Sequence, residues 1–100
     1  MLFRSVYRSV LDSPTASTLR DVILDFTTGD KIDLSLIDAD TVTAGDQAFT
    51  FIGTAAYSKV AGQLRVSSTL VEGDVNGDGI SDFAITIGMP APPVATDFVL

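Results

Sequence analysis

The sequence predicts an all-β fold, a small β-sandwich of about six or seven short, mainly antiparallel strands with little helix. Apolar and polar residues alternate in several short segments that are rich in β-branched and aromatic side chains, a pattern typical of half-buried strands. Turns rich in Gly, Pro, Asn and Asp separate these segments. Of the 13 acidic residues only Glu72 is Glu, and Asp favours turns, caps and metal loops over helix interiors.

The N-terminal third of the chain contains three of the expected strands. Residues 3–10 predict a strand or arm that leads into a loop. Residues 21–26 alternate, a turn follows, and residues 31–34 resume the alternation, which indicates two strands around a turn. The Ser-x-x-Asp spacing of residues 35–38 is typical of a capped helical turn.

The C-terminal part contains the remaining strands. They are residues 48–52, 63–67, 69–72, 83–87 and the terminal 97–100. Phe49 and Phe51 lie two apart on one strand, so they point to one face and are predicted core residues. We expect residues 63–67 and 69–72 to form a strand pair on either side of Ser67-Ser68. Residues 90–93 include three prolines and cannot join a central sheet.

Composition excludes several functions. The chain of 100 residues makes one domain with a modest core, and its net charge of −7 disfavours nucleic-acid binding. It has no Cys and no His, which excludes thiol chemistry, zinc and haem ligation, Ser-His triads and the HExxH helix. Calcium, magnesium or no metal at all remains. No apolar run approaches about 20 residues, so membrane insertion is not expected, and no signal-peptide core follows Met1.

The most informative segment, residues 74–82, reads D-V-N-G-D-G-I-S-D. Oxygen side chains at positions 1, 3, 5 and 9 and a carbonyl at position 7 are typical of a calcium loop, because calcium takes six to eight hard oxygen ligands. The expected ligands are Asp74, Asn76, Asp78, Asp82 and the carbonyl of Ile80. Position 12 is Ile85 instead of the bidentate Glu of an EF-hand, and the flanks predict strands. We therefore expect a weak strand-loop-strand site closed by Asp82.

A plain hairpin is the alternative for this segment, because Asn76-Gly77 and Asp78-Gly79 are turn dipeptides that need no metal. Mutual repulsion of three carboxylates within nine residues favours a cation. Asp12 with Asp21 forms a second, weaker candidate, which the turn preferences of Asp explain equally well. Asp30 and Asp33 form a third acidic pair, but residues three apart on a strand face opposite sides, so shared ligation is not expected.

Six ordered segments resemble the C-terminal domain of serralysin-like RTX proteins. They are residues 21–26 (DVILDF), 29–35 (GDKIDLS), 45–49 (GDQAF), 61–65 (AGQLR), 73–79 (GDVNGDG) and 97–100 (DFVL). The resemblance covers about residues 3–100. It implies a single domain over residues 1–100, in which 1–20 join an upstream calcium-bound β-roll and 21–100 form a β-sandwich cap with a C-terminal secretion tail.

The resemblance further implies calcium as cofactor, the β-roll of the same polypeptide and the type I secretion machinery as partners, and a secreted, extracellular protein. Asp12 and Asp21 match a family loop that can supply carboxylates to the last calcium of the roll. The tail Asp97, Phe98, Val99 and Leu100 resembles the family's terminal secretion motif, although an ordinary final strand would read the same way. The family's zinc protease half is missing, so this segment is not expected to be an enzyme.

A calcium-stabilised extracellular binding or adhesion module is the alternative function, because similar loops also stabilise such proteins. A carboxylate-pair hydrolase is disfavoured, since only Asp could act and it is placed at turns.

Overall fold

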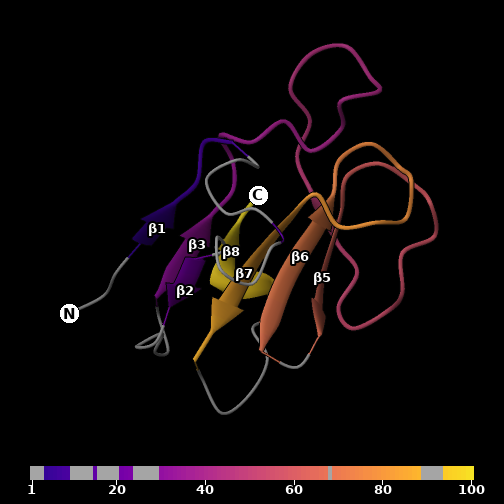
Figure 1. Ribbon diagram of the computed structural model, residues 1–100. Helices are drawn as coiled ribbons and strands as arrows, with labels where there is room; N and C mark the ends of the chain where they lie inside the picture. Colours follow the sequence, from indigo (N-terminus) through magenta and orange to yellow (C-terminus); the bar gives the residue numbers. More distant parts are fainter. Residues whose placement is uncertain (1–3, 10–14, 16–20, 24–29, 68, 89–93) are drawn as a thin grey trace.

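The computed structural model describes residues 4–9, 15, 21–23, 30–67, 69–88 and 94–100, which form two β-sheets (Figure 1). The three-stranded sheet has the order β1-β3-β8, formed by β1 (Arg4–Val6), β3 (Lys31–Asp33) and β8 (Phe98–Val99). The five-stranded sheet has the order β2-β7-β6-β5-β4, formed by β2 (Asp21–Ile23), β7 (Phe83–Ile87), β6 (Leu70–Asp74), β5 (Gln63–Ser67) and β4 (Thr50–Phe51).

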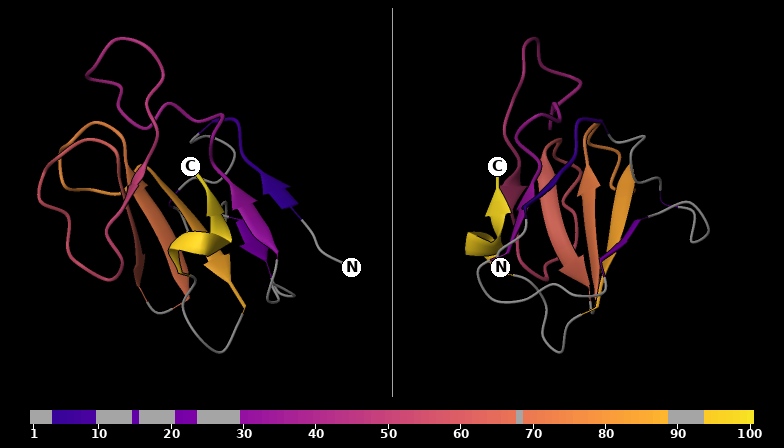
Figure 2. Two further views of the ribbon diagram at one scale, coloured as in Figure 1. Left: turned by 180° about the vertical axis from the view of Figure 1, so that it is seen from behind. Right: turned by 90° about the vertical axis from the view of Figure 1, so that its left-hand side faces the viewer.

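The helical structure of the described residues is the short 3-10 turn η2 (Ala95–Asp97), which precedes β8. Seen from behind, β8 lies in front of the five-stranded sheet, and in the side view the two lie on opposite sides of the molecule (Figure 2). The predicted all-β sandwich is therefore confirmed. Within the described part of the chain no helix has the length and apolar character that crossing a membrane requires.

The core lies between the two sheets and is built by the alternation that predicted the strands. In β5, Leu64 and Val66 are buried, while the alternate residues Gln63, Arg65 and Ser67 are more exposed. Ile32 of the smaller sheet joins the same cluster. Phe49 is 4% exposed and Phe51 packs against the core, which confirms both as core residues.

Two ring contacts stabilise the core, and the second of them connects the two sheets. The rings of Phe49 and Phe83 meet edge to face with centroids 5.6 Å apart. The rings of Phe51 and Phe98 lie 5.3 Å apart and join β4 to β8 of the opposite sheet. Aromatic pairs of this kind add about 0.5–1.5 kcal/mol to the burial of their surface.

Strand direction corrects the sequence prediction. The central β5-β6-β7 meander is antiparallel, as expected for the paired segments 63–67 and 69–72. The pairs β1-β3, β2-β7, β3-β8 and β4-β5 are parallel, so a mainly antiparallel fold was wrong for the outer strands. Alternation reports which face of a strand is buried and carries no information about the direction of its neighbour.

The helical turn expected at residues 35–38 is also corrected. The segment is a tight turn in which the Ile37 N–H donates to the Leu34 carbonyl over 3.1 Å. The Ser35 N–H and hydroxyl both donate to Asp33 Oδ1, so the Asp that precedes Ser35 organises the turn. Local bonding of this kind competes with helix formation.

Candidate metal centre

The segment 75–82 connects two neighbouring antiparallel strands, because β6 ends at Asp74 and β7 begins at Phe83. Its base is closed by the Asp82 N–H, which donates to the Gly73 carbonyl over 2.7 Å. Figure 1 shows it as the orange loop at one end of the five-stranded sheet. The two strands thus fix both ends of the loop, as the strand-loop-strand prediction requires.

Asp74 organises the loop from its base. Its side chain is 0% exposed. Oδ1 accepts from the N–H groups of Asn76 (3.2 Å) and Gly77 (2.9 Å), and Oδ2 accepts from the N–H of Gly79 (2.8 Å). Three backbone donors therefore hold this carboxylate in one orientation.

The next alternate side chains repeat the pattern. Asn76 Oδ1 accepts from the Asp78 N–H over 3.1 Å, and Asp78 Oδ1 accepts from the Ile80 N–H over 2.9 Å. Asp82 Oδ2 returns to the start of the loop and accepts from the Val75 N–H over 2.8 Å. Each oxygen side chain thereby turns the backbone toward the loop centre.

Two glycines allow this tight path. Gly77 and Gly79 have φ values of 77° and 80°, in the left-handed region that other residues rarely adopt. Gly79 is at position 6 of the loop, where calcium loops make a sharp turn, and Gly77 adds a second turn.

The three carboxylates converge on one point. Asp74, Asp78 and Asp82 each offer an oxygen, and these oxygens all lie within 4.8 Å of one another. Calcium binds oxygens at about 2.3–2.6 Å, so two ligands on one coordination sphere are separated by at most about 5 Å. The oxygens present therefore fit a calcium ion, and their hard, anionic chemistry suits it.

The electrostatics of the three-carboxylate cluster favour the binding of a cation. Burial raises the pKa of the Asp82 carboxyl, and the charges of Asp78 and Asp74 raise it further, against the lowering effect of the Val75 N–H. Within the described residues, no Lys or Arg forms an ion pair with these carboxylates, since the salt bridge found there joins Arg65 to Glu72. A bound cation would relieve this repulsion.

The structure brings together three of the five predicted ligands, the carboxylates of Asp74, Asp78 and Asp82. Asn76 and the carbonyl of Ile80 belong to the same loop, and ligation by them stays a prediction. Asp12 lies outside the described residues, and only the backbone of Asp21 is described, in β2. The second candidate site therefore stays a prediction.

The third acidic pair, Asp30 and Asp33, lies outside the metal loop. Asp30 and Asp33 are 3% and 6% exposed. They do not belong to the three-carboxylate group found among the described residues. Asp33 Oδ1 accepts from the Ser35 turn.

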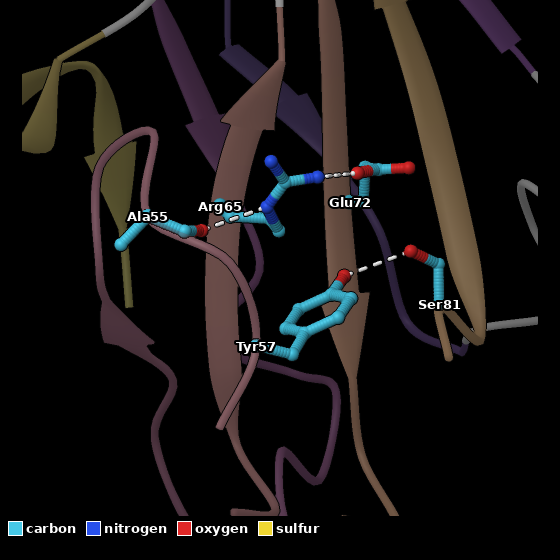
Figure 3. A network of polar contacts seen from close by, with 5 residues as sticks. All are labelled: Ala55, Tyr57, Arg65, Glu72 and Ser81. Carbon is cyan, nitrogen blue, oxygen red and sulfur yellow. Dashed lines mark hydrogen bonds and ion pairs between the residues drawn. The ribbon is translucent and has the colours of Figure 1, made fainter. Parts of the chain in front are cut away.

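Sequence reasoning missed a second segment that contacts the metal loop. The Tyr57 hydroxyl lies 2.8 Å from Ser81 Oγ within the loop (Figure 3). The Arg65 guanidinium lies 5.6 Å from the Tyr57 ring centroid, donates from Nε to the Ala55 carbonyl over 2.9 Å and pairs with Glu72. Burial raises the pKa of Tyr57 to about 12, so its hydroxyl keeps its proton at neutral pH.

These observations define a class of protein, small two-sheet β-domains that carry an acidic loop between two antiparallel strands. The family model described as peptidase M10 serralysin C terminal matches residues 3–100. The chain therefore belongs to the serralysin C-terminal family, as its six segments indicated. No protein with a curated description matches it significantly. The family is the C-terminal part of M10 peptidases and not their catalytic domain.

Proposed function

We propose that this chain is a non-catalytic, calcium-binding C-terminal module of a secreted protein such as an M10 metalloprotease. It caps an upstream β-roll, becomes rigid on binding calcium and carries a type I secretion signal. The observation that supports calcium binding most directly is the convergence of the Asp74, Asp78 and Asp82 carboxylates within 4.8 Å. Membership of the serralysin C-terminal family supports the secreted context.

The residues of the loop have separate roles in this proposal. Asp74, held by three N–H groups, presents its carboxylate in a fixed direction. Asp78 and Asp82 complete the negative charge, and Asn76 with the Ile80 carbonyl adds neutral oxygens. A bound calcium ion supplies the charge that neutralises this set. Mixed carboxylate, amide and carbonyl ligands suit calcium better than magnesium, which requires near-ideal octahedral geometry.

Calcium binding of this kind works as a folding switch. Without calcium, the repulsion of the clustered carboxylates opposes closure of a small core. When the calcium concentration is about ten times Kd, binding to the folded state alone adds about 1.4 kcal/mol per site. The chain therefore leaves a calcium-poor cytosol before it folds.

Calcium titration tests the site. We expect millimolar calcium to raise the Tm of the wild-type chain in a thermal melt, and Asp78→Ala to remove most of that rise. Asp46→Ala is the matched control, because it removes the same charge from an exposed position outside the cluster. A calcium response that survives Asp78→Ala would show that the loop is not the site.

The proposed secretion tail is ordered in the fold. Phe98 is 7% exposed, and the Leu34 N–H donates to the Val99 carbonyl over 2.9 Å. We expect a fusion of this chain to a passenger protein to be exported by a type I system, and deletion of residues 97–100 to stop the export. A second fusion that places further residues after Leu100 keeps β8 intact and should also lose export.

The same export assay separates the two functions under consideration. A calcium-stabilised adhesion module would be exported equally well with and without a free tail. Assaying secreted passenger activity in the culture medium, with total expression as the reference, distinguishes the two outcomes.

A further inference from the structure

A basic side chain that the proposed site does not use lies against the metal loop. A Cβ atom built onto Gly79 would lie 3.2 Å from Cγ and 3.8 Å from Cε of Lys59. The Lys59 carbonyl oxygen is likewise 3.6 Å from the corresponding position on Gly77. The aliphatic part of this exposed lysine therefore runs along the loop, beside the residue that follows Asp78.

The surrounding segment holds Lys59 in this position. Lys59 has a φ of 62°, a left-handed conformation that a non-glycine residue rarely adopts without support from its surroundings. The support comes from both sides. Tyr57 bonds to Ser81, and the Gly62 N–H donates to the Asp74 carbonyl over 2.7 Å.

A further pair of bonds closes this segment on itself. The Ser58 N–H donates to Gln63 Oε1 over 2.9 Å, and Gln63 Nε2 donates to Ser58 Oγ over 2.8 Å. Ser58 precedes Lys59 and Gln63 follows it, so these bonds hold the backbone on both sides of the lysine.

We propose that Lys59 is a tethered counter-ion of the metal loop, which stabilises the calcium-free loop and lowers its affinity for calcium. This inference rests on the proposed calcium site. The ammonium nitrogen is one bond beyond Cε, which lies beside Gly79 of the loop, and charges interact over a Debye length of about 8 Å at physiological salt. The ammonium charge attracts the carboxylates when no calcium is bound. The same charge repels a calcium ion that binds among them.

Lys59 thereby sets the calcium concentration at which the module becomes rigid. The positive charge weakens the affinity of the loop for calcium. The loop therefore binds no calcium at the low concentration inside the cell and binds it at the higher concentration outside. Exposed charge pairs change equilibria by about two- to fivefold, so an effect of that size on Kd is expected.

Isothermal titration with calcium chloride on the full chain tests this inference. Lys59→Gln, which removes the charge, is expected to lower Kd about two- to fivefold and to lower the Tm measured in chelator. Lys59→Arg, which keeps the charge, should behave like wild type. Lys31→Gln is the control for net charge, because Lys31 lies on β3 of the other sheet, and its Kd should stay close to that of wild type.

The dependence on ionic strength is a second readout. A purely structural effect of Lys59 would not depend on salt concentration, whereas an effect of its charge would. Raising the salt concentration from about 0.05 to 0.5 M should reduce the difference in Kd between wild type and Lys59→Gln, since screening shortens the range of the interaction. An unchanged or higher Kd in Lys59→Gln, or an equally lowered Kd in Lys59→Arg, would overturn the inference while leaving the calcium site in place. Failure of the wild-type chain to bind calcium would overturn both.

Discussion

Asp74→Ala is expected to remove the calcium response of this domain and also to destabilise its calcium-free form by about 2–4 kcal/mol. Asp74 is 0% exposed and accepts from the N–H groups of Asn76, Gly77 and Gly79. Alanine leaves these part-buried donors without their acceptor, and loss of an acceptor costs about 1–3 kcal/mol where a donor is kept from water. Relief of repulsion among the carboxylates acts in the opposite direction but is smaller, about 1 kcal/mol or less, because the neighbouring charges of Asp78 and Asp82 are at least partly exposed.

Urea denaturation with and without calcium separates the two effects of this substitution. Asp74→Asn is the matched variant, because its amide oxygen can still accept a hydrogen bond while the negative charge is lost. We expect Asp74→Asn to keep more of the calcium-free stability than Asp74→Ala and to lose the calcium response equally. If Asp74→Ala still showed the full calcium-induced increase in the free energy of unfolding, the role assigned to this residue would be contradicted.

The metal loop could be predicted from the sequence because its geometry is local. Asp74, Asn76 and Asp78 are two residues apart, and each side chain bonds to backbone within a few positions of itself. Spacing in the sequence therefore determines which oxygens converge. The buried faces of the strands were predictable for the same reason, since Leu64 and Val66 follow the period of two that a strand imposes.

The segment that contacts the metal loop could not be predicted, because it depends on tertiary packing. Tyr57 and Ser81 are 24 residues apart, and the small residues around Tyr57 show no periodicity. The direction of β8 also depends on a contact between distant parts of the chain, because β8 pairs with β3, more than 60 residues earlier. Such contacts depend on how the sheets stack, which no local pattern encodes.

Gly73→Ala is expected to destabilise the domain by about 3 kcal/mol or more, a large part of the 5–15 kcal/mol of a typical domain. Gly73 lies in β6 opposite Phe83 of β7. An added Cβ would lie 2.3 Å from Phe83 Cε1, closer than a Cβ atom can approach, and would make a tight contact of 3.1 Å with Phe49 Cε1. Phe83 is 1% exposed and packs edge to face on Phe49, so neither ring can move aside in a close-packed interior.

The substitution should also weaken calcium binding, because Phe83 directly follows Asp82 and any shift of β7 moves this carboxylate. Chemical denaturation gives the loss of stability, and Gly53→Ala is the control. Gly53 has a φ of 66° with open space around its Cβ position, so alanine there meets only backbone strain, about 1 kcal/mol. Equal losses at the two positions would contradict the steric argument. The double variant Gly73→Ala with Phe83→Leu should lose less than the sum of the single variants, since the smaller side chain gives the new methyl group room.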